Sequence, residues 1–295
     1  MNIDLPAGRY VVAVSGGVDS VVLLHLLQQL PGMHLTVAHY DHGIRPDSAE
    51  DRRYVQELAR RYGLPFVHDT GNLGPGASEA TARTARYNFL HNVRQASGAG
   101  AIVTAHHQDD ALETVVLNLL RGTGRRGLSS LKSTDAVKRP LLHVPKNELL
   151  RYAAEQGLAW REDSTNADTR YLRNHIRARI MPRFADTHRE ALLAMSRRAH
   201  ELNQEIEQQL AHYLHLQSQA RTLDRHTFIM LPHAVAREVM AEWLRLHTGA
   251  ELSRKMLERL VVAAKTGKSG SSVDVDAGHW LDISPARLAL RPRER

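Results

Sequence analysis

Short β-branched runs alternate with longer segments of helical length through the first half of the chain. The first run ends in the glycine turn Ser15–Gly17, and an apolar segment long enough for a helix follows. The predicted strands cover residues 9–14, 34–38, 65–68 and 101–104, and the predicted helices cover 20–30, 48–62, 78–97 and 109–120. Strands that alternate with helices form crossover units, so the pattern predicts an α/β fold with a mostly parallel, doubly wound sheet covered on both faces.

The pattern changes in the second half of the chain. From residue 186 onward helical segments dominate, and the glycine–serine turn at 267–272 leads into short alternating strands such as 273–276. We therefore place a domain boundary near residues 185–190. The prediction is a first domain over residues 1–187 and a smaller, mainly helical domain over residues 188–295.

The composition is that of an ordinary globular protein, with 295 residues, 42% of them hydrophobic and 24% charged. No stretch approaches the roughly 18 uninterrupted apolar residues that a membrane span needs. Residues 1–10 carry Asp4 and Arg9 and lack the apolar region of a signal peptide. These features predict a cytoplasmic protein without a membrane partner.

The charge balance favours an anionic partner. The net charge is +7 and the pI about 9.8, and residues 121–139 contain six lysines and arginines against one aspartate. Nucleic acid is the leading candidate, while charge retained for solubility is the alternative. The chain has no cysteine, which excludes disulfides, thiolate zinc sites, iron–sulfur clusters and cysteine nucleophiles.

The segment Ser15–Gly16–Gly17–Val18–Asp19–Ser20 joins the first predicted strand to the first predicted helix. Two glycines let the backbone approach an anion, and the helix N-terminus offers free amides and a partial positive charge. Asp19 could hold Mg²⁺, and the Ser20 hydroxyl could bind a phosphate. The lysine of a Walker loop is missing. The alternative is a glycine turn capped by Asp19 or Ser20, but the strand and helix around it favour phosphate binding.

A second group of polar residues, His106 to Thr114, surrounds the start of the helix predicted at 109–120. Steps of 100° per residue place Asp109, Asp110 and Glu113 on one face. These carboxylates repel one another unless a metal, an arginine or an ammonium substrate supplies a cation. The alternative is acidic decoration of a helix N-terminus. His106 and His107 could also be core or capping residues, and His107 is the weaker candidate of the two.

Both segments resemble those of a known family. Residues 15–20 resemble the loop of the PP-loop (N-type) ATP pyrophosphatase superfamily, and residues 106–114 with 118–128 resemble the signature of the tRNA(Ile)-lysidine synthetases. The resemblance runs in order through roughly the first two thirds of the chain. Further matching segments are residues 41–45, 78–83, 86–87, 139–142, Trp160, 162–166 and 173–177. Three positions depart from the family: Ala111 replaces a glutamine, Tyr40 an aliphatic residue and His175 an arginine.

The resemblance implies a Rossmann-like fold of the HUP type and a specific ligase reaction. ATP would adenylate the wobble cytidine of a CAU-anticodon tRNA(Ile), and the ε-amine of L-lysine would then displace AMP to give lysidine. It implies that Ser15–Ser20 bind ATP, that Asp19 lies near Mg²⁺, and that Arg86 and His106 steady developing charge. It also suggests a homodimer, and it makes residues 1–187 the catalytic PP-loop domain and residues 188–295 a domain that contacts tRNA or serves as a linker. The carboxylates Asp110 and Glu113 would attract the lysine ammonium, and the candidate tRNA contacts are Arg121, Arg125, Arg126, Arg173 and Arg177.

Two readings of a different class stay open at this point. A non-catalytic nucleotide-binding module would bind ATP but would need neither Asp110 and Glu113 nor a basic loop. A pyrophosphatase relative that ligates an amine or amide on a small molecule would cleave ATP without RNA, and the arginine-rich segments argue against it. For any single arginine of these segments, a solvated basic face is the simpler interpretation.

Overall fold

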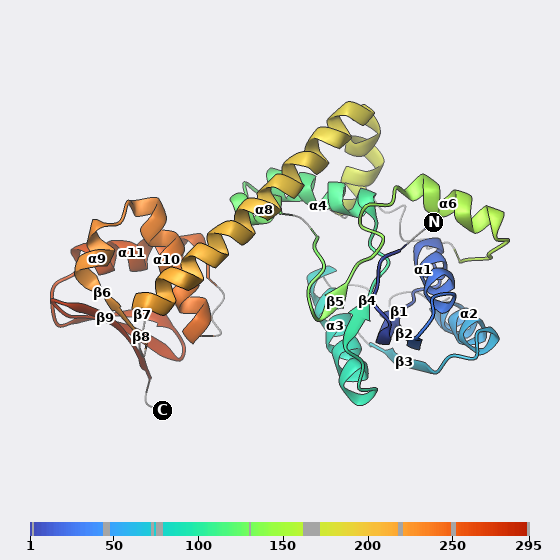
Figure 1. The fold of residues 1–295 in the computed structure, drawn as a ribbon, viewed down its shortest axis with the longest axis horizontal. Coiled ribbons are helices and arrows are strands. Elements are labelled where there is room, and N and C mark those ends of the chain that lie inside the picture. The colour runs from blue at the N-terminus through green and yellow to red at the C-terminus, as the bar shows by residue number, and fades with distance from the viewer. Residues whose placement is uncertain are drawn as a thin grey trace. The chain divides into compact units, whose positions relative to one another are not determined.

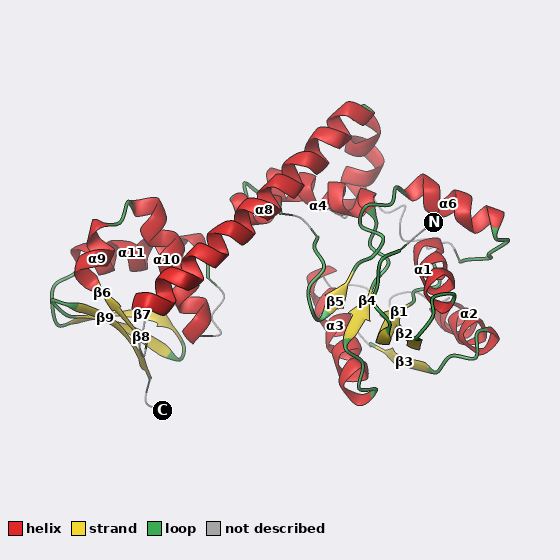
Figure 2. Cartoon of the chain, viewed as in Figure 1, coloured by secondary structure: helices red, strands yellow, loops and turns green. Residues whose placement is uncertain are grey.

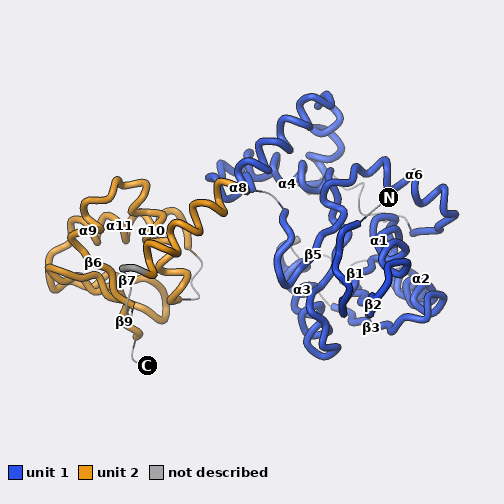
Figure 3. Tube along the Cα trace, viewed as in Figure 1, with its two compact units in different colours: residues 1–200 blue, residues 201–295 orange. Residues whose placement is uncertain are grey.

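A computed structural model describes residues 1, 3–43, 48–71, 74, 79–129, 131–161, 172–217, 221–248 and 252–293. The chain divides into two compact units, residues 1–200 and 201–295 (Figure 1, Figure 3). The boundary between the units falls within one long helix, α8 (Asp186–Gln217). The predicted division into residues 1–187 and 188–295 stays a prediction.

The first unit contains a five-stranded sheet in which every described pair of neighbouring strands is parallel. The spatial order is β3-β2-β1-β4-β5. The strands β2 and β3 therefore lie on one side of β1, and β4 and β5 lie on the other. The strands are β1 (Gly8–Ala13), β2 (Met33–Asp41), β3 (Phe66–Thr70), β4 (Ala101–Val103) and β5 (Val137–Lys138). This topology confirms the predicted doubly wound, Rossmann-like α/β fold.

Helices cover both faces of this sheet (Figure 2). Alternate residues of β1 point to opposite faces: Val12 packs with α1, α2 and α6, whereas Val11 packs with α3. Both valines are fully buried, which explains why the strand reads as a continuous apolar run. The helices are α1 (Val18–Gln28), α2 (Ser48–Arg61), α3 (Glu79–Ala96), α4 (Gln108–Leu120), α5 (Arg125–Leu128) and α6 (Lys146–Glu155).

A small apolar cluster fixes the segment after α6 against α4. Leu112 and Val116 of α4 pack on Ile176 and Met181. Ile176 opens a π-helical turn (Ile176–Ile180) between α7 (Leu172–His175) and a single 3₁₀ turn (Met181–Arg183). Because Ile176 is fully buried, the polar side chains beside it in the sequence are held along α4.

The second unit is a four-stranded antiparallel sheet packed against helices, as the smaller, mainly helical domain with short strands predicted. The strands, in the order β6-β9-β8-β7, are β6 (Thr222–Asp224), β9 (Arg287–Pro292), β8 (His279–Ile283) and β7 (Ser271–Asp276). The helices are α9 (Arg225–Met230), α10 (His233–His247) and α11 (Arg254–Thr266). Trp243 and Phe228 are almost fully buried in its core.

One buried arginine links the helices of the second unit to its sheet. Arg225 is 8% exposed, and its guanidinium donates to three main-chain carbonyls, those of Ala264 (3.0 Å), Ser284 (3.0 Å) and Gly267 (2.6 Å). These carbonyls lie at the end of α11 and beyond β8, so a single side chain joins the helical layer to the sheet. Among the described residues of the chain, no helix is long and apolar enough to cross a membrane.

Candidate active site

The polar residues singled out in the sequence gather at the carboxyl edge of the parallel sheet. The glycine loop follows β1, and His106 and His107 follow β4, the strand beside it. The strand order reverses between these two strands, and open α/β sheets bind ligands in the crevice at such a point. The order of the strands therefore places the two predicted motifs next to each other.

Ser20 holds the glycine loop from within. Its hydroxyl oxygen accepts from the amides of Ser15 and Gly16, both at 3.2 Å, and its proton is donated to the carbonyl of Gly17 at 2.8 Å. Gly16 has a φ of +99°, a backbone conformation that side chains other than glycine rarely adopt. The loop is thus a tight turn leading into α1, as phosphate binding requires.

Arg161, which is far from this loop in the sequence, holds it in place through the Gly16 carbonyl. Its main-chain N–H donates to the carbonyl of Gly16 at 3.0 Å, and its guanidinium binds Asp51 (2.9 Å) and Glu50 (2.7 Å) on α2. The C=O and N–H of a trans peptide point in opposite directions. Anchoring the Gly16 carbonyl therefore turns the N–H of Gly17 to the other side of the loop.

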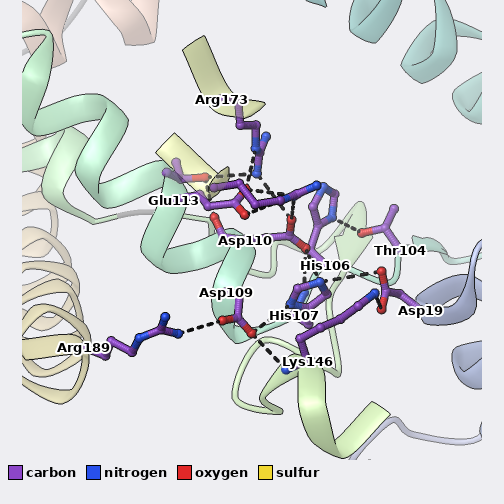
Figure 4. A network of polar contacts seen from close by, with 12 residues as sticks. Asp19, Thr104, His106, His107, Asp109, Asp110, Glu113, Lys146, Arg173 and Arg189 are labelled. Atoms are coloured by element: carbon purple, nitrogen blue, oxygen red, sulfur yellow. Dashed lines mark hydrogen bonds and ion pairs between the residues drawn. The ribbon is translucent and has the colours of Figure 1, made fainter. Parts of the chain in front are cut away.

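Lys146 supplies the cation that the loop itself lacks. It begins α6, and its ammonium lies 2.5 Å from the Asp19 carboxylate, while its main-chain N–H donates to Asp109 at 2.9 Å (Figure 4). One residue thereby joins the glycine loop to α4. The sequence does not indicate that Lys146 belongs to this site, because Lys146 lies 127 positions from Asp19 in a segment with no motif of its own.

His107 is the centre of a carboxylate cluster. It is 6% exposed, and its ring nitrogens lie 3.6 Å from Asp19, 3.6 Å from Asp109 and 3.5 Å from Asp110. Burial alone would lower the pKa of His107, but these carboxylates outweigh it and raise the pKa above its usual value. The contact with His107 in turn lowers the pKa of Asp109 to about 2. His107 therefore balances negative charge here, a larger role than the sequence indicated.

His106 has the opposite electrostatic character. Its Nδ1 lies 2.8 Å from the Thr104 hydroxyl. Burial lowers the pKa of His106 to about 3, and the nearby guanidiniums of Arg86 and Arg139 act in the same direction. The ring is therefore neutral at physiological pH, so it can exchange hydrogen bonds but cannot offer a full positive charge.

The carboxylates of α4 are already neutralised by arginines. Glu113 is 2% exposed and accepts from Arg177 at 2.6 and 2.9 Å and from Arg173 at 3.1 Å. Asp110 lies 3.6 Å from both guanidiniums. Burial would raise the pKa of Asp110, but His107, His106 and Arg173 bring it below its usual value. Of the cations that the sequence left open, the structure places arginine here.

The remaining predicted residues divide into two groups. Arg173 and Arg177, predicted to contact tRNA, lie in the carboxylate cluster, whereas the exposed Arg121 follows α4 and Arg125 and Arg126 form part of α5. The roles predicted for individual residues stay predictions. The matching segments at 44–45 and 162–166, and residue 78 of the segment at 78–83, lie outside the described residues.

Comparison with known proteins identifies the class. A sequence profile described as the PP-loop domain matches residues 2–184, and the chain belongs to this family. The relatives are, more specifically, enzymes named tRNA(Ile)-lysidine synthase, which confirms the resemblance found in the motifs. The protein of Thermus thermophilus is 42% identical over 199 residues, covering 65% of this chain and 39% of that protein. The protein of Deinococcus deserti is 34% identical over 295 residues, covering 97% and 53%.

The curated relatives are longer than this chain. The chain spans 39–61% of the length of the first eight curated relatives that it matches. Among solved structures, the U34-tRNA thiolase NcsA from Methanococcus maripaludis matches with a TM-score of 0.56 at 20% identity, covering 67% of this chain and 73% of that one. This second likeness concerns the fold alone.

Proposed function

We propose that this chain carries the catalytic part of a tRNA(Ile)-lysidine synthetase. The reaction joins L-lysine to the wobble cytidine of a CAU-anticodon tRNA(Ile) and releases AMP and pyrophosphate. One observation carries the proposal: the glycine loop, Lys146 and the start of α4 meet at one edge of the sheet, within residues 2–184 that match the PP-loop domain.

The PP-loop domain implies that the chain binds ATP, and we assign its phosphates to residues 15–20. The N-terminus of α1 and the Lys146 ammonium both offer positive charge there. Mg²⁺ is usually held by one or two carboxylates together with substrate phosphates. Asp19 is the carboxylate at the loop that would take this role, in exchange for its contact with Lys146. The ion would supply charge neutralisation at the phosphates.

In the first step, the carbon-2 oxygen of cytidine attacks the α-phosphorus of ATP and pyrophosphate leaves. Negative charge accumulates on the phosphate oxygens, so preorganised cations lower the barrier. Lys146 and Arg86 are suited to this role because both are charged. His106 is neutral, and we assign it hydrogen bonding to the phosphate or to the adenylated base.

In the second step, the lysine ε-amine, having lost a proton, attacks carbon-2, and AMP leaves with the former base oxygen. We assign attraction of the incoming ammonium to Asp110 and Glu113. Arg173 and Arg177 occupy these carboxylates in this structure, so lysine has to displace at least one guanidinium. The same arginines could then turn to tRNA phosphates, alongside Arg121, Arg125 and Arg126.

The decisive experiment is incorporation of labelled lysine into a CAU-anticodon tRNA(Ile) transcript with ATP and Mg²⁺, with a tRNA(Met) control. We expect label in tRNA(Ile) only, accompanied by AMP. AMP release without RNA would instead favour a small-molecule ligase, and a folded protein without ATP turnover would favour a binding module. A cytoplasmic, homodimeric enzyme is part of the proposal, and sedimentation of the purified chain tests the dimer.

A further inference from the structure

Three arginines converge on one tyrosine beside His106. Tyr87 and its neighbours Arg83 and Arg86 lie in the first turns of α3, and Arg139 directly follows β5 at the same edge of the sheet. The guanidinium carbons of Arg83 and Arg86 lie 4.8 and 5.5 Å from the centre of the Tyr87 ring. Arg139 and Arg83 donate to the Tyr87 oxygen at 3.3 and 3.5 Å.

These guanidiniums have no anionic partner in the described part of the chain. None of Arg83, Arg86 and Arg139 forms an ion pair there, unlike Arg173 and Arg177. Arg139 is only 9% exposed. The Nε atoms of Arg86 and Arg139 are buried and have no hydrogen-bond partner among the described residues. A buried positive charge without a counter-charge is costly, so the grouping is suited to an anion.

Tyr87 adds a further donor. A phenol oxygen has two acceptor sites and one proton. Because two guanidiniums occupy its acceptor side, its own O–H is left to donate outward. Burial raises the pKa of Tyr87, but Arg83, Arg139 and Arg86 together bring it below its ordinary value, which strengthens the O–H as a donor. The cluster therefore presents only donors and positive charge.

We propose that Arg83, Arg139 and the Tyr87 hydroxyl form a phosphate-binding site, which takes a backbone phosphodiester of the RNA next to the reacting nucleotide, while Arg86 beside them keeps its role at the reacting phosphate. The planar fork of arginine matches the paired oxygens of a phosphate. The phosphates of ATP, the other source of the same chemistry, already have the glycine loop and Lys146. The RNA assignment rests on the proposed function, whereas the anion site itself does not.

The test compares Arg83→Gln and Tyr87→Phe with Arg94→Gln, which removes an arginine from the opposite end of α3. Binding of a fluorescent CAU anticodon stem–loop is measured by anisotropy across salt concentrations, and KM for ATP is measured in parallel. We expect Arg83→Gln to bind the RNA about tenfold more weakly, with a salt slope smaller by about 1. Tyr87→Phe should weaken binding about threefold without changing the slope, since it removes a neutral donor. Arg94→Gln should match the wild type.

Two results would overturn the assignment. One is unchanged RNA affinity with a tenfold higher KM for ATP, which would give the site to the ATP phosphates. The other is wild-type behaviour of both variants. Arg139→Lys, which keeps the charge but loses the fork, replaces any variant whose circular dichroism shows misfolding.

Failure of the proposed function is recognised separately, by a wild type that neither binds the stem–loop nor makes AMP. The anion site is then tested with inorganic sulfate alone. Sulfate should raise the melting temperature of the wild type and of Arg94→Gln by more than that of Arg83→Gln. Equal increases in all three proteins would refute the site.

Discussion

Arg225 in the second unit and Arg139 in the first are almost equally buried, at 8% and 9% exposure. Arg225 donates to three main-chain carbonyls. Arg139 also donates, to Tyr87 and to the carbonyl of Lys132, but its Nε stays without a partner in the described structure. Burial by itself therefore does not distinguish a structural charge from a functional one. The groups around the guanidinium do: Arg225 lies among main-chain carbonyls, whereas Arg139 lies beside Tyr87 with two other arginines. The predictions below compare charges of these two kinds.

The largest effect is expected at the edge of the sheet. Lys146→Met removes the cation beside Asp19, so AMP formation should fall about 1,000-fold. The melting temperature should change little, because the Lys146 side chain is 36% exposed. Single-turnover AMP release measures the first quantity and calorimetry the second. A stability loss that parallels the activity loss would make Lys146 a structural residue.

Arg225→Met should show the reverse behaviour. Three carbonyls lose their donors, so the free energy of unfolding should fall by about 3 kcal/mol. The protein that remains folded should retain the KM for ATP of the wild type. Urea titration provides the measurement, and Arg287→Met on the exposed side of β9 is the control, expected within about 0.5 kcal/mol of the wild type. Equal effects of both substitutions would contradict the role of Arg225.

Glu113→Gln tests a carboxylate that is buried and fully engaged. If Glu113 attracts the lysine ammonium, its neutral isostere should raise KM for lysine about thirtyfold. KM for ATP should stay within about twofold of the wild type, because the glycine loop is untouched. Steady-state kinetics with each substrate varied provides the test. Equal increases in both constants would refute the ammonium assignment.

Arg161→Ala tests support of the glycine loop from behind. Loss of the contacts to Asp51 and Glu50 frees the segment whose N–H orients the Gly16 peptide, so KM for ATP should rise about tenfold. KM for lysine should not change. Glu50→Gln is the control, because the Glu50 side chain is 58% exposed and such ion pairs contribute little. Arg161→Lys should restore part of the affinity for ATP. If Arg161→Ala has the same KM for ATP as both Glu50→Gln and Arg161→Lys, Arg161 does not support the loop.

The smallest effect concerns Asp109 and pH. Its pKa is lowered from 3.8 to about 2, so its ionised form stabilises the folded protein. That contribution is complete above about pH 4 and is lost as the pH falls toward 2. Asp109→Asn should therefore cost about 1 kcal/mol at pH 7 and less at pH 2.5. Urea unfolding at both values measures the difference, and a constant difference would exclude the ionised carboxylate as its source.

The sequence predicts motifs that lie within one short segment, but it does not predict contacts between residues that are far apart in the chain. The glycine loop and the acidic face of α4 each lie within one short segment, so residue types and helical spacing were sufficient to find them. Lys146 and Arg161 reach their partners across 127 and 110 positions, and no periodicity indicates which distant cation faces a given carboxylate. For the same reason, the pairing of Arg173 and Arg177 with Glu113 could not be predicted.

The hydrogen bond from Arg161 to the loop has a consequence for how this position can change over evolutionary time. The bond to Gly16 is made by the main chain, so any residue with a main-chain N–H can form it, provided that the segment is held in place. Other residue types are therefore tolerated at position 161 when compensating substitutions in α2 keep the segment in place. Proline is the one residue type that cannot form this bond, because it has no main-chain N–H.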